Sequence, residues 1–154
     1  MPAGPFTRTA GFYKNHPTIT QQILNGEPGL RVCGHLITDV DVDHGHSALE
    51  AMCVSPHGDQ RLQLMRQLVT AALNLLSGSS ATFSNYLSCD VTCQDLDASE
   101  SAVASCISQT DGFNESGDPL PAPWDPAGPA DPTPCQFAGD TPCLALYPDT
   151  CLVP

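Results

Sequence analysis

No lysine or arginine follows Arg66 in this chain of 154 residues. All five basic residues lie in residues 1–66 with six acids, a balance of −1, whereas residues 67–154 contain eleven acids and no base, a balance of −11. Phosphate binding requires clustered cations, so this distribution argues against nucleic acid as a partner. Cations or basic surfaces are the partners that the charge favours.

The sequence also lacks any apolar run that approaches the roughly 20 residues needed to cross a bilayer, so membrane insertion is not expected. Residues 1–5 do not have the charged-then-apolar order of a signal peptide, so an exported chain would use a signal removed earlier or another route. Hydrophobic residues make up 41% of the chain and charged ones only 14%, which permits one domain with a real core.

Cysteine is abundant against this background. An even number of cysteines without a redox or zinc spacing predicts up to four disulfides formed outside the cytosol, and therefore a secreted, extracellular or cell-surface protein. A cytosolic protein with free thiols is the competing interpretation. The eight residues are Cys33, Cys53, Cys89, Cys93, Cys106, Cys135, Cys143 and Cys151. Their pairing is not fixed by the sequence, and we expect Cys33–Cys53 in the first half, with the last three cysteines pairing among themselves or with Cys89, Cys93 and Cys106.

Helical periodicity is clearest over residues 60–76, where apolar residues recur at three- and four-residue intervals before Ser77 and Gly78. This pattern predicts an amphipathic helix that forms the wall of the core. Shorter helices are predicted over 18–26, with Thr18 as the cap, and from Asp97, where Glu100 would complete a capping box. A strand is expected within residues 30–42.

Residues 117–154 contain ten of the fifteen prolines, which exclude a helix or a long strand. Trp124 and three cysteines would anchor this segment. The predicted fold is therefore mainly α with extensive irregular structure. It comprises an N-terminal arm (1–10), a small disulfide-rich helical domain (11–116) and a Pro-rich, disulfide-stapled C-terminal extension (117–154). The extension would be ordered by disulfides, by packing on the helical part or by a neighbouring subunit.

Two motifs in the first half resemble a family of secreted bacterial proteins. Residues 11–17 read Gly-Phe-Tyr-Lys-Asn-His-Pro, and residues 64–74 read Leu-Met-Arg-Gln-Leu-Val-Thr-Ala-Ala-Leu-Asn. The family typically has Gly-[Tyr/Phe]-Trp-Lys-Asn-His-Pro followed by a helix of the LRQAVAALLNA type, so Tyr13 departs from its tryptophan. Family members are largely uncharacterised exported and cell-surface proteins. The resemblance therefore implies an extracellular helical module and supplies no reaction.

The segment Asp39–Glu50 has the spacing of a twelve-residue calcium loop, with Asp39, Asp41, Asp43 and Glu50 as carboxylate ligands. The turn glycine is displaced, because His44 occupies the sixth position and Gly45 follows it. The alternative interpretation is an acidic loop that leads into a helix over 47–53, with Ser47 as its cap and Glu50 completing a capping box. Calcium is the candidate cofactor.

Histidines offer a second metal hypothesis and a weak enzymatic one. His44 and His46 are two apart, which on a strand would place both imidazoles on one face for a transition metal such as zinc or copper, with His35 and His57 nearby in sequence. No Gly-x-Ser-x-Gly elbow exists, so no catalytic residue is assigned. His16 and Lys14 are expected to form a structural corner that ties the N-terminal arm to the long helix. Asn114 begins a formal glycosylation sequon.

These patterns favour a secreted structural or assembly protein that self-associates into a homopolymer, such as the repeating subunit of an extracellular filament or surface layer. An extracellular metal-binding module built on residues 39–50 is the first alternative. An uncharacterised exported enzyme is the second.

Overall fold

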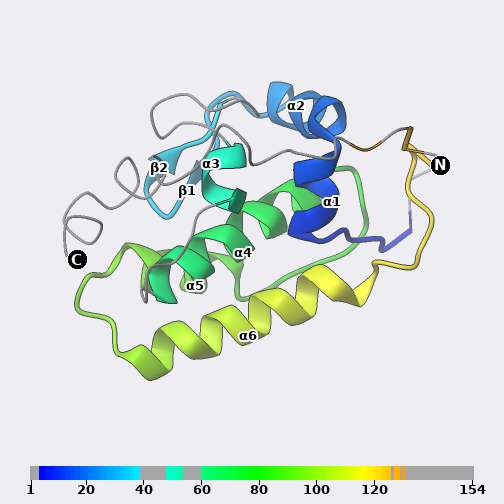
Figure 1. Cartoon of the computed structure of the whole chain (residues 1–154). Coiled ribbons are helices and arrows are strands. Elements are labelled where there is room, and N and C mark those ends of the chain that lie inside the picture. Colours follow the sequence, from blue (N-terminus) through cyan, green and yellow to red (C-terminus); the bar gives the residue numbers. More distant parts are fainter. Residues whose placement is uncertain (1–3, 39–47, 54–59, 126, 129, 131–154) are drawn as a thin grey trace.

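The computed structural model describes residues 4–38, 48–53, 60–125, 127, 128 and 130, and over these residues the chain is mainly helical (Figure 1). Its elements, in chain order, are α1 (Ala10–Asn15), α2 (Pro17–Asn25), β1 (Arg31–Val32), β2 (His35–Leu36), α3 (Ala48–Cys53), α4 (Gln60–Leu76), α5 (Tyr86–Gln94) and α6 (Glu100–Ser116). The predicted mainly helical class is confirmed. The predicted disulfide stapling of the tail falls on residues from 131 onward, which lie outside the described residues.

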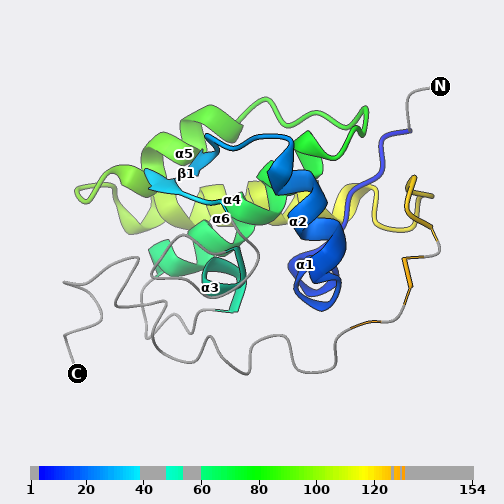
Figure 2. The same cartoon turned by 90° about the horizontal axis from the view of Figure 1, so that it is seen from above.

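The long helix α4 is the centre of the core, as its periodicity predicted. Ten of its residues are buried, among them Leu62, Leu68 and Leu73, because the other helices pack around it on several sides (Figures 1 and 2). α6 runs alongside α4, and α3 and α5 contact it from other directions. None of the described helices is both long enough and apolar enough to span a membrane.

Two predicted helix starts are wrong by one or two residues. α2 begins at Pro17 with His16 as its N-cap, not at Thr18, because proline is favoured at the first helical position, where its missing N–H is not needed. α6 is capped by Ser99, whose hydroxyl accepts the N–H of Ala102 at 3.1 Å, and not by Asp97. α3 begins at Ala48, as the loop-into-helix interpretation of residues 39–53 predicts, while Ser47 lies outside the described residues.

The strand expected within residues 30–42 is a short antiparallel hairpin, in which Arg31 pairs with Leu36 and Val32 with His35. Its turn contains Cys33 and Gly34, both with positive φ, which is uncommon for a residue other than glycine. The N–H of Cys33 donates to a carboxylate oxygen of Asp90 at 2.6 Å. The hairpin is therefore held against α5 at its turn.

Disulfides fix α5 from both sides, with a pairing that differs from the one expected. Cys33 pairs with Cys93, so the predicted Cys33–Cys53 bond is wrong. Cys89 pairs with Cys106, which also excludes bonds from Cys89, Cys93 or Cys106 to the tail cysteines. The spacing of Cys89 and Cys93 does place both on the buried face of α5, each in a different disulfide. α5 is thus tied to the hairpin and to α6.

Candidate functional site

The corner between α1 and α2 is built from the first resemblance motif. Thr9 caps α1 by accepting the N–H of Phe12, and the hydroxyl of Thr20 donates to the carbonyl oxygens of Tyr13 at 2.9 Å and His16 at 3.3 Å. His16 stacks on Phe12, and its Nδ1–H donates to the Phe12 carbonyl oxygen over 2.8 Å. The imidazole therefore serves the corner, as the structural interpretation of this motif predicts.

Asn74, the last residue of the second motif, uses all of its hydrogen-bonding capacity in the core. Its Oδ1 accepts the hydroxyl of Tyr13 at 2.6 Å and the backbone N–H of Arg8 at 2.7 Å. Its Nδ2 donates to the carbonyl oxygen of Arg8 at 2.9 Å and to Oδ1 of Asn114 at 3.0 Å. A fully satisfied buried amide fixes one arrangement of its neighbours. Asn74 thus joins the N-terminal segment, α1, α4 and α6.

Arg8 is buried, with 7% of its surface exposed, and binds the segment that follows α6. Its guanidinium donates to the carbonyl oxygens of Asp118 at 2.9 Å and Leu120 at 2.7 Å, and it forms a 3.3 Å ion pair with Asp125. Gly117 lies directly against the backbone of residues 5–7 and donates its N–H to Thr7 Oγ1 at 2.9 Å. The N-terminal arm and residues 117–125 are therefore clasped together.

An aromatic cluster adds to this clasp. Trp124 stacks on Phe12 at 5.8 Å between ring centroids and meets Phe6 edge-on at 5.1 Å. Its Nε1–H is buried, with no acceptor among the described residues. Trp124 thus packs on residues of the N-terminal segment and α1, while the predicted anchoring of the whole extension, including its cysteines, falls largely outside the described residues.

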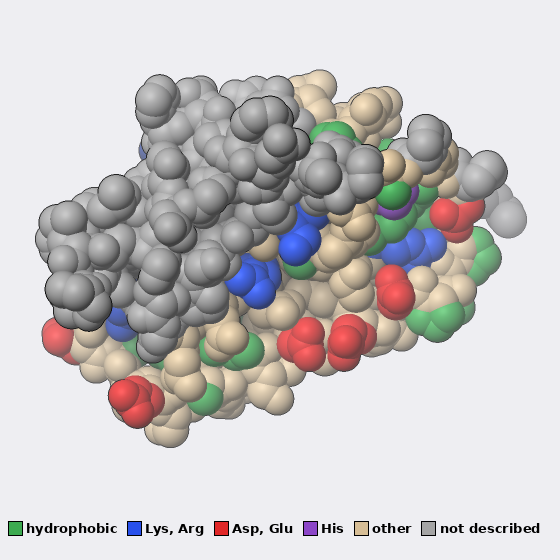
Figure 3. Space-filling model, viewed as in Figure 1, with side chains coloured by type: hydrophobic (Ala, Val, Ile, Leu, Met, Phe, Trp, Pro, Cys, Tyr) green, Lys and Arg blue, Asp and Glu red, His purple; other side chains and the backbone are tan. Residues whose placement is uncertain are grey.

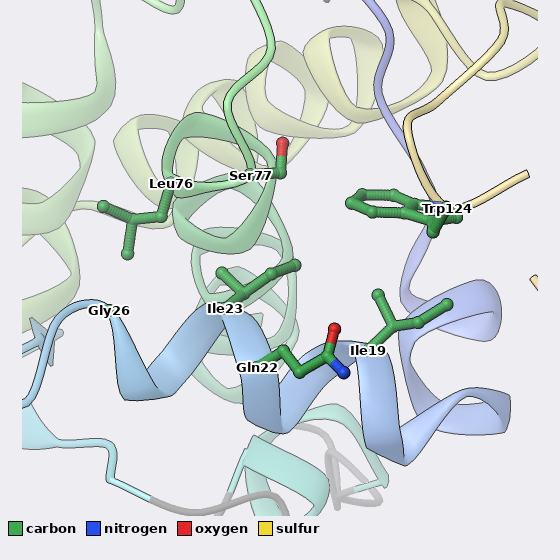
Figure 4. Close-up of a pocket in the computed structure, with 7 residues that line it drawn as sticks. All are labelled: Ile19, Gln22, Ile23, Gly26, Leu76, Ser77 and Trp124. Atoms are coloured by element: carbon green, nitrogen blue, oxygen red, sulfur yellow. The ribbon is translucent and has the colours of Figure 1, made fainter.

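Beside this cluster lies an open groove of about 270 Å³, which we call the Trp124 groove. Figure 4 shows that α2 forms one side, the end of α4 the back, and the indole of Trp124 the far side. Its lining residues are Ile19, Gln22, Ile23, Gly26, Leu76, Ser77 and Trp124. None of these side chains is charged, and the one hydroxyl among them is that of Ser77. This hydroxyl donates to the carbonyl oxygen of Asn74 at 2.6 Å. The groove is therefore suited to apolar contact and not to acid–base chemistry.

The chain has no significant match among protein-family models, curated proteins or solved structures. Its function must therefore be argued from its own residues.

The second distinctive surface is the outer face of α5. Leu87 and Val91, four residues apart and thus on one side of the helix, are 76% and 64% exposed, and we call this pair the apolar stripe. Leu96, two residues beyond the end of α5, is 73% exposed. These are the three most exposed large hydrophobic residues of the described chain. On the face shown in Figure 3, the region of α6 has scattered Asp, Glu and hydrophobic side chains among other residues and backbone.

Burial shifts several pKa values around the core. It raises the pKa of Tyr13 well above its usual value, against the opposing effect of the Arg8 charge, and it raises that of Tyr86, where the Asp90 carboxylate adds to the shift. Burial, reinforced by the nearby charge of Arg66, lowers the pKa of Lys14, and burial lowers that of Arg66. The two tyrosines are therefore neutral, structural groups at ordinary pH.

Most residues of the two metal hypotheses fall outside the described chain. This applies to Asp39, Asp41, Asp43, His44 and His46, and also to His57, Cys135, Cys143 and Cys151. Glu50 and Cys53 lie in α3 without a described side chain. Among the described residues no group of three His, Cys, Asp or Glu side chains comes together. The calcium and transition-metal sites both stay predictions.

The remaining candidates have structural surroundings. His35 lies in β2 and His16 in the corner, on separate elements. Asn114 is only 2% exposed, and its Nδ2 donates to the carbonyl oxygen and to Oε1 of Gln67 at 3.0 and 2.9 Å. A glycan could not be attached to it in the folded chain.

Sequence reasoning missed the Trp124 groove and the apolar stripe. A tryptophan within a Pro-rich segment was a signal for the groove, but Ile19 and Ile23 looked like ordinary helix residues. No sequence pattern indicated the apolar stripe, because Leu87 and Val91 have the same four-residue spacing as Cys89 and Cys93, and the sequence does not show which pair is buried.

Proposed function

We propose that the protein is a secreted structural protein that self-associates, serving as the repeating subunit of an extracellular filament or surface layer. The apolar stripe of α5 carries this proposal. A soluble chain gains nothing from keeping Leu87 and Val91 in water, and contiguous exposed apolar surface is typical of interaction sites. Burying each such side chain contributes about 1.5–3 kcal/mol, reduced here because each is already partly covered.

The fixed backbone of α5 supports the same proposal. Disulfides to the hairpin and to α6 hold the helix by its buried face, so the stripe is presented without further ordering. Preorganisation of this kind lowers the cost of association. The same two disulfides are compatible with an extracellular location, because such bonds persist in oxidising compartments. The resemblance to exported bacterial proteins agrees with that location.

Charge provides a signature for the proposed contact. Each copy carries a formal net charge of −12, so two copies repel each other. Added salt screens that repulsion, with a Debye length of about 8 Å at 0.15 M and about 3 Å at 1 M, but leaves apolar contact intact. Association through the stripe should therefore strengthen as ionic strength rises, whereas association through ion pairs would weaken.

Native, non-reduced protein examined by electron microscopy and sedimentation velocity tests the proposal. We expect fibres, sheets or concentration-dependent oligomers that are lost in the Leu87→Ser/Val91→Ser variant. Leu120→Ser is the matched control, since it removes another exposed apolar side chain, 39% exposed, away from α5. Particles of one chain at every concentration and salt level would show the proposal to be wrong. A parallel series in chelator tests whether the predicted calcium loop takes part.

A further inference from the structure

The Trp124 groove and the apolar stripe are complementary surfaces of one molecule. The groove offers Ile19, Ile23, Leu76 and the indole of Trp124, and the stripe offers two aliphatic side chains one helical turn apart. A helix that lays residues i and i+4 into an apolar groove is a recurring mode of recognition. We propose, resting on the function proposed above, that the Trp124 groove of one copy receives the apolar stripe of the next copy.

The dimensions of the two surfaces agree. The groove measures about 270 Å³, and an apolar cavity of about 150 Å³ is enough for one benzene molecule. One leucine and one valine side chain therefore fit together. The groove is open to solvent, and Figure 4 shows Ile19, Ile23 and Trp124 around the space that the two side chains would enter. Gly26 leaves its part of the lining flat.

The charge pattern selects the groove as the receiver. No lining residue of the groove is charged, so the stripe meets no ion that would lose its water. A stripe-to-stripe contact would instead oppose two copies of a segment, residues 86–97, that contains three acids and no base. Like charges across an interface oppose association. The neutral groove therefore favours a head-to-tail contact over a symmetric one.

The placement of the two surfaces makes the contact repeat. α5 lies on the left in Figures 1 and 2, whereas α2 and the segment around residue 124 lie to its right in both views. A copy that receives a stripe still presents its own stripe to the next copy. Such head-to-tail contacts produce open chains unless the rotation between copies closes a ring. The geometry thus predicts linear growth.

Three variants that leave the net charge at −12 separate the two halves of the contact. Leu87→Ser/Val91→Ser removes the stripe. Gly26→Gln fills the groove at a position where φ is −77°, so any side chain fits the backbone, and Leu76→Ser removes part of the wall at a residue that is 37% exposed. Circular dichroism and thermal melting establish that each variant is folded. Leu120→Ser again serves as the control.

Sedimentation velocity and mass photometry of the variants, alone and mixed, provide the test. We expect the stripe variant and both groove variants to associate at least tenfold more weakly than wild type. An equimolar mixture of stripe and groove variants should form pairs that grow no further, because the one intact stripe fits the one intact groove. The control should assemble like wild type.

The alternative outcomes are distinct. Groove variants that assemble like wild type, while the stripe variant does not, would overturn the groove as receiver and leave the proposed function standing. Assembly that no variant changes would overturn both surfaces. Wild-type protein that remains a single chain at every concentration would overturn the inference together with the function on which it rests.

Discussion

Replacing Asn74 by alanine should lower the free energy of unfolding by about 4 kcal/mol. The change leaves four buried groups without partners: the N–H and carbonyl of Arg8, the hydroxyl of Tyr13 and Oδ1 of Asn114. An unsatisfied buried group costs about 1–3 kcal/mol. We take the lower end for each, because water that enters the space left by the amide satisfies some of them.

Urea denaturation of non-reduced protein, followed by far-ultraviolet circular dichroism, measures this loss. Tyr13→Phe is the matched control, since it removes one bond while Oδ1 of Asn74 keeps the N–H of Arg8. It should cost about 1 kcal/mol, the net value of one hydrogen bond. An Asn74→Ala variant within 1 kcal/mol of wild type would refute the idea that these groups depend on a single amide.

Three further outcomes follow from the described contacts. By loop entropy, removing Cys33–Cys93 should lower the free energy of unfolding by about 4 kcal/mol and removing Cys89–Cys106 by about 3 kcal/mol, because the bonds close loops of 60 and 17 residues. Denaturation of the paired Cys→Ser variants measures both losses, and the reverse order would contradict this account. Gly117→Ala should lower the free energy of unfolding by about 1–3 kcal/mol, since a Cβ would lie 2.7 Å from the Thr7 nitrogen. Gly112→Ala should raise it by about 0.5–1 kcal/mol in the same assay, because a Cβ at this position of α6 would have no atom within 4 Å. Stability should also fall above about pH 10, because the unfolded chain releases the protons of Tyr13 and Tyr86 before the folded chain does; Tyr13→Phe and Tyr86→Phe should flatten that fall in urea titrations.

Local patterns predicted the helices well. α4 could be predicted from apolar spacing alone, because a helix of about five turns with such an apolar stripe must bury that stripe against other elements. Its limits also held, since Ser77 and Gly78 come directly after it. Helix starts were less certain: Asp97 and Ser99 are both good caps, and only the path of the chain into α6 selects Ser99.

Contacts between residues far apart in the sequence could not be predicted, because local patterns do not show which distant segments meet. Nothing near Cys33 in the sequence indicates that its turn contacts α5, because its partner cysteine, Cys93, lies 60 residues further along the chain. Arg8 is a second example, because an arginine among polar neighbours is expected at the surface. Its burial depends on the carbonyl oxygens of Asp118 and Leu120, in the segment that follows α6 and lies more than 100 residues away in the sequence. The groove depends on the same distant approach of Trp124.

The clasp between Arg8 and residues 117–125 has a consequence for how the chain matures. Arg8 and Leu120 are 112 positions apart, so the guanidinium finds its acceptors only when almost the whole described chain is present. Closing so long a loop is slow relative to forming α4 or α6. The contact between the N-terminal segment and residues 117–125 should therefore be the last to form, which pulsed hydrogen exchange would detect as late protection of the Gly117 amide, whose N–H donates to Thr7 Oγ1. The clasp therefore closes after the helices that lie between its two halves have formed.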